Sequence, residues 1–496
     1  MSATSQTALS AAAPAGRPRR SAHHWWVLVV LGLAQLMVVL DATIVNIALP
    51  SAQKALHFSN ADRQWVVTAY ALSFGGLLLL AGRLADLFGR KRTFLVGLIG
   101  FAAVSAIGGA STGFTMLVVA RACQGVFGAL LAPSALSLLT TTFTDPKERA
   151  EAFGIYGAIA GAGGAVGLLL GGALTEYADW RWCLYVNAVF AVAAGIGGSM
   201  VLHDQERPAR VPIDLPGTLT AVAGLVSLVY GFSEASTKSW TSPVTLALLA
   251  ASAALLAGFV AIERRREHPL LPLRILKHRA RGGANLAMLL TGIAMFGVFL
   301  FLTYYLQLIL RYSPVMTGVA FLPMLGMVIV VATTSGTFML PRIGPRPLVT
   351  VGLVIAGVGM VLMSGFTVTS GYGDSVLPSL LVVGAGLGLI FGATMNVATA
   401  GAAPEDAGVA SALPNVAQQI GGALGPALLN TIATTATASM LAGQRVTPRL
   451  LAVASVHGDV TAFRVVYVIL FASAVVSFLI LPRGRAAVAH HRVHVA

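Results

Sequence analysis

Long apolar runs separated by short polar segments follow one another along almost the entire chain. The hydrocarbon core of a bilayer is about 30 Å thick and is crossed by a helix of about 20 apolar residues. By that measure the 496 residues contain fourteen predicted spans, at 25–49, 64–82, 93–113, 114–141, 150–175, 182–202, 214–234, 243–262, 284–308, 317–340, 347–368, 376–400, 408–438 and 461–482. The pattern predicts an all-α membrane protein.

Composition agrees with this interpretation and excludes several other classes of protein. Only 10% of the residues are charged, whereas a soluble domain has about 25%. The net charge of +14 does not indicate a nucleic-acid partner, because the charges lie in short segments between apolar runs. We therefore expect membrane lipid, and no nucleic acid, around the chain.

Cofactor, metal and nucleotide chemistry are not indicated either. Cys123 and Cys183 both lie in apolar runs, which favours packing roles over a disulfide or a metal site. No lysine follows a glycine, so the chain lacks a phosphate-binding G-K-[ST] loop and we do not expect an enzyme. The tail histidines are interpreted as part of a disordered tail and not as a metal site: His490, His491 and His494.

The distribution of basic residues predicts the orientation. The run from Trp25 to Pro50 is too long for a signal-peptide core, so we expect it to be retained as the first span. With an even number of spans both termini lie on one side, and most of the 32 lysines and arginines also fall on that side. The positive-inside rule then predicts a multi-pass protein of the cytoplasmic (inner) membrane with both termini in the cytoplasm.

The largest basic cluster falls in one predicted cytoplasmic loop. It either contacts anionic lipid head groups or acts only as a topology signal. Its members are Arg264, Arg265, Arg266, Arg274, Lys277, Arg279 and Arg281.

Ionisable residues inside predicted spans are the main candidates for chemistry, because a charge in hydrocarbon is costly. Asp41 in the first span and Arg121 in the fourth lie at similar depths, so they can form a pair. Burial disfavours the charged form of the carboxyl group and a neighbouring arginine favours it. That competition suits a proton-binding group that couples proton movement to transport; the alternative is a fixed buried ion pair.

Amide side chains are candidates for a substrate cavity. Gln35 and Asn46 share one face of the first span, about 120° from Asp41, so either the amides or the carboxylate faces the cavity. Gln124 follows Arg121, and a polar stripe in the thirteenth span consists of Asn415, Gln418 and Gln419. Hydrogen bonding between helices is the alternative role for that stripe.

Tyrosines near the outer end of the ninth span have a different interpretation. Tyr304 and Tyr305, together with Gln307, are more typical of an interfacial aromatic belt than of a binding site.

Two segments have a conformational interpretation. The segment GRLADLFGRKR, between the second and third spans, combines an acid, a glycine turn and basic residues, which predicts a latch at the cytoplasmic face; a solvated loop is the alternative. The latch residues are Gly82, Asp86, Gly89, Arg90 and Lys91. A faint repeat aligns Gly89 with Gly344. In the fifth span, glycines permit close packing or bending, at Gly154, Gly163, Gly167, Gly171 and Gly172.

These motifs resemble those of the major facilitator superfamily, and within it the fourteen-helix drug/proton antiporters, over essentially the whole chain. The 82–92 segment matches the loop signature, Arg121 with Gln124 matches the helix-four signature, and LDATIVNIALP at 40–50 resembles the helix-one signature. WVVTAY at 65–70 and WRWCLYVN at 180–187 are further similar segments. One departure is Leu168, where the antiporter signature has proline.

The resemblance implies two six-helix halves with two helices inserted between them. The expected parts are a cytoplasmic tail 1–24, an N-terminal half 25–202, inserted helices and a basic loop 203–283, a C-terminal half 284–482 and a cytoplasmic tail 483–496. The expected function is proton-coupled export of small amphipathic compounds by a monomer, with Asp41 and Arg121 in proton coupling. Proton-coupled nutrient uptake and a non-transporting receptor or scaffold are the alternatives.

Overall fold

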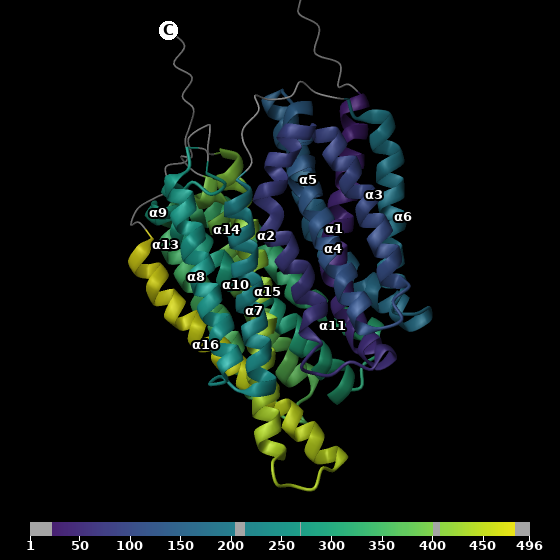
Figure 1. Cartoon of the computed structure of the whole chain (residues 1–496), viewed down its shortest axis with the longest axis vertical. Helices are drawn as coiled ribbons and strands as arrows, with labels where there is room; N and C mark the ends of the chain where they lie inside the picture. The colour runs from purple at the N-terminus through teal and green to yellow at the C-terminus, as the bar shows by residue number, and fades with distance from the viewer. Residues whose placement is uncertain (1–21, 204–213, 268, 400–406, 482–496) are drawn as a thin grey trace, which may run out of the picture.

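The computed structural model describes residues 22–203, 214–267, 269–399 and 407–481, and these are helices joined by short turns, without a strand among them. Figure 1 shows the helices arranged as a bundle of long, nearly parallel rods. The first eight are α1 Ala22–Leu56, α2 Gln64–Phe88, α3 Arg90–Gly109, α4 Phe114–Thr142, α5 Pro146–Tyr177, α6 Trp182–Val201, α7 Leu215–Lys238 and α8 Pro243–Arg265. The rest are α9 Leu273–Lys277, α10 Arg279–Tyr304, α11 Pro314–Thr334, α12 Leu340–Ile343, α13 Pro345–Met363, α14 Leu377–Thr399, α15 Ala407–Leu441 and α16 Pro448–Ile480.

Three short π-helical segments adjoin long helices of the described chain. The segment Tyr305–Ile309 continues α10, Ser335–Met339 continues α11, and Tyr372–Val376 precedes α14. All fourteen predicted spans overlap long helices of the structure. Thirteen helical segments in the described chain are long and apolar enough to cross a membrane. The remaining span is α15, a 35-residue helix that carries the predicted stripe of asparagine and glutamine.

The helices form two halves. Helices α1 to α6 pack on one another, as do α10 to α16, and Figure 1 shows the two groups side by side. Helices α7 and α8 pack together, and α7 also lies against α2 of the first half and α15 of the second. Trp65 Nε1 donates to Ser233 Oγ at 3.1 Å, and Thr431 Oγ1 donates to the Phe232 carbonyl oxygen at 2.7 Å. The inserted pair therefore contacts both halves.

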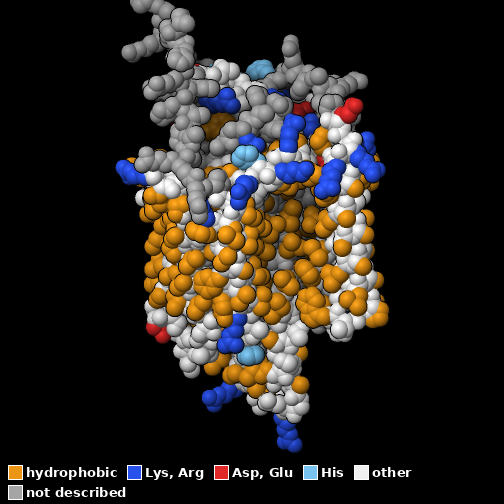
Figure 2. Space-filling view, turned by 90° about the vertical axis from the view of Figure 1, so that its left-hand side faces the viewer, with side chains coloured by type: hydrophobic (Ala, Val, Ile, Leu, Met, Phe, Trp, Pro, Cys, Tyr) orange, Lys and Arg blue, Asp and Glu red, His pale blue; other side chains and the backbone are white. Residues whose placement is uncertain are grey.

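The outer surface is apolar around its middle. Figure 2 shows a broad hydrophobic belt, with basic side chains gathered at the edge nearer the chain termini and fewer at the opposite edge. Large apolar side chains of the long helices are exposed, including Ile99, Met200 and Val330. Because such a surface is unfavourable in water, it fits contact with lipid tails.

The aligned glycines of the two halves have the same local conformation. Gly89, between α2 and α3, has φ 94°, and Gly344, between α12 and α13, has φ 80°. Residues with a Cβ rarely adopt these angles, so glycine is required for both turns. The faint repeat in the sequence thus corresponds to equivalent turns in the two halves.

One helix boundary differs substantially from the prediction. The last span was expected to begin at 461, but α16 begins at Pro448. The first turns of α16 contain His457 and Asp459, and such polar residues make a helix start look like a loop. The longer helix places Asp459 next to Arg63, which precedes α2.

Candidate functional site

Asp41 and Arg121 form a buried ion pair in the middle of the first half. Arg121 Nη1 lies 2.7 Å from Asp41 Oδ2. The side-chain exposure is 0% for Asp41 and 2% for Arg121. Both are held by long apolar helices, α1 and α4, which place the charges away from either helix end. The sequence allowed this pair, and the structure brings it together.

Arg121 uses the rest of its guanidinium group to fix its position. Its Nε donates to the Val66 carbonyl oxygen at 3.0 Å, and Nη1 also donates to Gln124 Oε1 at 2.8 Å. The guanidinium carbon lies 4.5 Å from the centre of the Tyr70 ring, a distance at which cation–π attraction is effective. Arg121 therefore retains partners even when its ion pair with Asp41 is broken.

Two amides complete the surroundings of Asp41. Asn187 Nδ2 donates to Asp41 Oδ1 at 2.6 Å, and Gln124 Nε2 reaches the same oxygen at 3.3 Å. Gln124 Nε2 also donates to Ser105 Oγ at 2.7 Å. The Asp41 carboxylate therefore joins α1 to α4 and α6, and Gln124 extends the site to α3.

Sequence reasoning did not identify Asn187, Ser105 or Tyr70 as site residues. Asn187 and Tyr70 lie at the ends of the two segments, 180–187 and 65–70, that carried the family resemblance. The available signal was that each of these segments ends in a polar residue within an apolar run. Ser105 offered none, because single serines are common in membrane helices.

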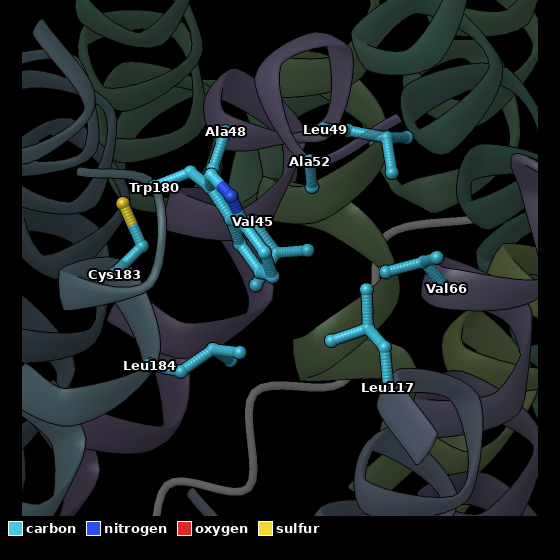
Figure 3. A pocket seen from close by; sticks show the side chains of 9 residues that line it. All are labelled: Val45, Ala48, Leu49, Ala52, Val66, Leu117, Trp180, Cys183 and Leu184. Carbon is cyan, nitrogen blue, oxygen red and sulfur yellow. The ribbon is translucent and has the colours of Figure 1, made fainter. Parts of the chain in front are cut away.

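An apolar pocket separates this site from the end of the molecule opposite the termini. Its α1 residues lie about one to three helical turns after Asp41, and Figure 3 shows the lining side chains around a common space. The lining residues are Val45, Ala48, Leu49, Ala52, Val66, Leu117, Trp180, Cys183 and Leu184. No carboxyl, amide or basic side chain is among the described residues that line this pocket.

Helix α5 packs closely on α1 through its glycines. A Cβ at Gly163 would lie 3.2 Å from Val39, and one at Gly171 would lie 2.8 Å from Ile44, both on α1. Gly167 faces Leu40 and Thr43 of α1 in the same way. These glycines hold α5 against the helix that carries Asp41.

The two ends of the glycine row differ in how closely they are packed. Gly172 packs on the second half, where a Cβ would lie 2.7 Å from the Pro314 carbonyl oxygen, whereas Gly154 has no atom within 4 Å of that position. Leu168, the residue in place of the expected proline, is fully buried, and its carbonyl group packs against Gly318 of α11. The glycine face of α5 is thus packed towards one end and open towards the other.

The predicted cavity amides lie in several places. Gln35 accepts a hydrogen bond from Tyr156 of α5 at 2.7 Å, and Asn46 is buried and donates to the Ala42 carbonyl oxygen at 3.0 Å. Asn415 is exposed, and Gln418 Nε2 lies 3.9 Å from the sulfur of Met295. Among the predicted cavity residues in the described part of the chain, Gln124 hydrogen-bonds to Asp41, whereas Gln35, Asn46 and Gln418 have different partners.

Gln419 and the latch segment complete the predicted set. Gln419 packs against Gly75 of α2. A Cβ added to Gly75 would lie 2.9 Å from the Gln419 Cβ. In the latch segment Arg90 Nη2 lies 3.6 Å from Asp86 Oδ1, and Lys91 donates to the Ser199 carbonyl oxygen at 3.4 Å. Gly82 lies near Pro133 of α4. The tail histidines lie outside the described residues.

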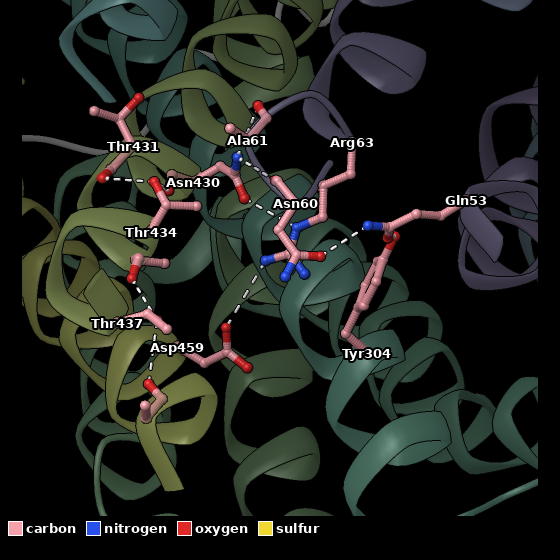
Figure 4. A network of polar contacts seen from close by, with 12 residues as sticks. Gln53, Asn60, Ala61, Arg63, Tyr304, Asn430, Thr431, Thr434, Thr437 and Asp459 are labelled. Carbon is pink, nitrogen blue, oxygen red and sulfur yellow. Dashed lines mark hydrogen bonds and ion pairs between the residues drawn. The ribbon is translucent and has the colours of Figure 1, made fainter. Parts of the chain in front are cut away.

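A second polar network joins the two halves at the end opposite the termini (Figure 4). Arg63, which precedes α2, is 6% exposed and donates through Nε to Asn430 Oδ1 of α15 at 2.9 Å. Its Nη2 lies 3.9 Å from Asp459 Oδ1 of α16, and its guanidinium carbon lies 4.2 Å from the centre of the Tyr304 ring. Asn430 also donates to the Asn60 carbonyl oxygen at 3.0 Å.

This network corrects the interpretation of the tyrosines. Tyr304 and Tyr305 are 4% and 3% exposed, so they do not form a lipid-facing belt. The Tyr304 hydroxyl donates to Gln53 Oε1 of the first half, and the Tyr305 hydroxyl donates to the Thr367 carbonyl oxygen at 2.7 Å. The belt interpretation was wrong because both side chains turn towards protein partners that only the tertiary structure supplies.

The chain is similar to known proteins in both sequence and fold. The family model described as Major Facilitator Superfamily matches residues 31–426. A puromycin resistance protein of Streptomyces alboniger is 49% identical over 475 residues, covering 95% of this chain and 93% of that protein. A cephamycin export protein of Amycolatopsis lactamdurans is 37% identical over 434 residues, covering 87% and 89%. The crystal structure of a bacterial homologue of the human lysosomal transporter Spinster, in an inward-facing and occupied conformation, has a TM-score of 0.65 at 17% identity and covers 94% and 97%.

Proposed function

We propose that this chain, which belongs to the major facilitator superfamily, is a proton-coupled exporter of small amphipathic antibiotics. As a member of that family it is a multi-pass membrane transporter and not an enzyme. Fold and family are thereby established.

The proposed location is the cytoplasmic membrane, with both termini in the cytoplasm. The basic side chains at the termini end of the apolar belt support this orientation, because cytoplasmic loops are enriched in lysine and arginine. The Arg63 network then lies at the outer face. Because one chain supplies both halves around the central region, the proposed working form is a monomer.

The observation that carries the proposal is a fully buried carboxylate with one cationic partner. When Asp41 is charged, Arg121, Gln124 and Asn187 compensate for its burial. When it binds a proton the charge on Arg121 loses its counter-ion, although the Val66 carbonyl and Tyr70 ring still hold the guanidinium group. Protonation therefore changes the forces between α1 and α4, and α5 is packed on α1 through its glycines.

The energy available from one proton sets the scale of export. Moving a unit charge through 100 mV yields about 2.3 kcal/mol, and one pH unit adds about 1.4 kcal/mol. Together they support a substrate gradient of a few hundred-fold. Exchange of one proton for a monovalent cation moves no net charge, so it would use only the pH gradient, which supports about tenfold.

Puromycin is the first compound to test as a substrate. The relative with 49% identity over nearly the whole chain is a puromycin resistance protein. Puromycin combines an aromatic group, a nucleoside and an ionisable amine, so it belongs to the amphipathic class. The second relative, a cephamycin export protein, makes a β-lactam the comparison compound.

The test uses everted membrane vesicles from an efflux-deficient bacterial host, acidified inside by respiration. Vesicles with the full chain should accumulate labelled puromycin, and Asp41→Asn should abolish accumulation at normal expression. The matched control is Asp62→Asn, because Asp62 is a partly exposed acid that accepts a hydrogen bond from Ser59 Oγ at 2.6 Å. Collapsing the pH gradient with nigericin and the potential with valinomycin separates the two driving forces.

Each outcome has a distinct meaning. Proton coupling through Asp41 is contradicted if puromycin still accumulates in the presence of both ionophores. It is also contradicted if puromycin still accumulates in the Asp41→Asn variant. Uptake into intact cells without accumulation in everted vesicles indicates import. Transport of neither compound, in a chain that proves folded by size-exclusion chromatography, overturns the antibiotic substrate class.

A further inference from the structure

Asn187 differs from the other partners of Asp41 because one end of its amide group makes no hydrogen bond in the described structure. It is fully buried on α6, and its Nδ2 makes the shortest hydrogen bond to Asp41, at 2.6 Å. Its carbonyl oxygen, Oδ1, has no hydrogen-bond partner in the described structure. A buried acceptor without a donor is unfavourable, and such groups in a native protein call for an explanation.

Gln124 shows what a fixed amide looks like in the same site. Its Oε1 accepts from Arg121 at 2.8 Å, and its Nε2 donates to Ser105 as well as to Asp41. Turning this amide over would point its oxygen at a carboxylate and its NH2 group at a cation. Gln124 is therefore held in one orientation by both ends.

Asn187 is free of that restraint. Rotating its amide by 180° about the last side-chain bond breaks only the bond to Asp41, because nothing binds the oxygen. Rotations about such sp³–sp² bonds have broad, roughly two-fold preferences. The rotation would place Oδ1 where Nδ2 now lies, next to Asp41 Oδ1.

The two orientations suit the two protonation states of Asp41. A charged carboxylate can only accept hydrogen bonds, whereas a protonated one has an O–H donor that needs an acceptor when it is buried. We propose that Asn187 is a positioning residue of proton coupling, whose amide donates to charged Asp41 and turns over to accept a hydrogen bond from protonated Asp41. This inference rests on the proposed function and adds to it the device that lets a fully buried carboxyl group exist in both forms.

The other two side chains that hydrogen-bond to Asp41 do not offer this choice. Arg121 of α4 is a donor only, and Gln124 is fixed as described. Tyr70 of α2 and Cys183 of α6 are the other titratable groups whose charge would act on Asp41. Cys183 shares a hydrogen bond with Thr175 at 3.3 Å. Helix α5 presents glycine to this region of α1.

The test is an infrared titration of the purified full chain in lipid nanodiscs. The C=O stretching band of protonated Asp41 is identified by its absence in Asp41→Asn, and its intensity is followed against pH. Asn187→Leu keeps the approximate shape of the side chain without hydrogen bonding. Asn187→Ser keeps a group that both donates and accepts, so it is the rescuing variant.

Asn187→Leu should change two measurements. The midpoint of the titration should rise by about one pH unit, because the hydrogen bond to the charged form is worth more than the one to the neutral form. The C=O band of protonated Asp41 should also shift, since its O–H group loses its acceptor. Asn187→Ser should leave both closer to the wild type.

The remaining outcomes overturn specific parts of the inference. A raised midpoint with an unmoved band means that Asn187 only donates to charged Asp41, and the rotation is rejected. An unchanged midpoint and band mean that Asn187 has only a packing role. If the wild type has no titrating band that depends on Asp41, the proposed function itself fails.

Discussion

Arg63 and Asn430 are separated by 367 residues in the sequence, yet the Arg63 Nε atom lies 2.9 Å from Asn430 Oδ1. They belong to different halves, and the same guanidinium group also faces Tyr304 and Asp459. A buried arginine shared by the two halves stabilises the conformation in which they meet at this end. Any conformation that opens this end must break these contacts.

Arg63→Ala should therefore weaken closure at the outer end. Spin labels at His57→Cys and Thr369→Cys, both exposed at this end, would report the separation of the halves in a background with both native cysteines replaced by alanine. The distance distribution should gain a longer component in Arg63→Ala. Lys54→Ala, which removes an exposed basic side chain nearby, should leave it unchanged. An unaltered distribution in Arg63→Ala would show that the network does not hold the halves together.

Arg121→Lys should impair transport although the positive charge is retained. Arg121 donates to Asp41, Gln124 and the Val66 carbonyl oxygen and stacks on Tyr70. A lysine ammonium group is a single point charge and cannot reproduce this planar arrangement. We expect at least about a tenfold loss of puromycin accumulation, equivalent to about 1.4 kcal/mol. Accumulation equal to wild type would show that charge alone suffices.

Gly125→Val should destabilise the fold through overpacking. A Cβ at Gly125 on α4 would lie 2.8 Å from Ser73 Cβ and 2.9 Å from the Phe74 backbone nitrogen on α2. Forcing extra carbon atoms into such a contact costs about 1–3 kcal/mol. The melting temperature in detergent should fall by several degrees. Gly258→Val in α8, where a Cβ would meet nothing within 4 Å, is the control and should melt near the wild type.

Asp86→Asn distinguishes the two interpretations of the 82–92 segment, a latch or a solvated loop. The Asp86–Arg90 pair is partly exposed, with side-chain exposures of 44% and 23%, so its contribution to stability is under about 1 kcal/mol. If the segment acts as a latch in the transport cycle, transport should fall severalfold while the melting temperature stays the same. Normal transport in Asp86→Asn would support the solvated-loop interpretation. A parallel loss of both quantities would point to misfolding.

The sequence was sufficient to predict the fold class, because lipid imposes a simple rule on the chain. Every backbone group that crosses the hydrocarbon must be bonded within its own helix. Each span is thus a local, countable feature, and all fourteen predicted spans overlap helices. Asp41 and Arg121 were found for a related reason, since a charge in an apolar run is conspicuous.

The tertiary structure decided which polar groups meet. Asn187, Tyr70 and Ser105 complete the site from three different helices, and the periodicity of one helix does not specify the face that its neighbours present. The network around Arg63 depends on α16 beginning at Pro448 and on the docking of two halves. Apolar patterning determines the number of helices, because the pattern is local to each segment. Hydrogen bonds between segments depend on helix rotations and contacts that exist only after the helices have packed.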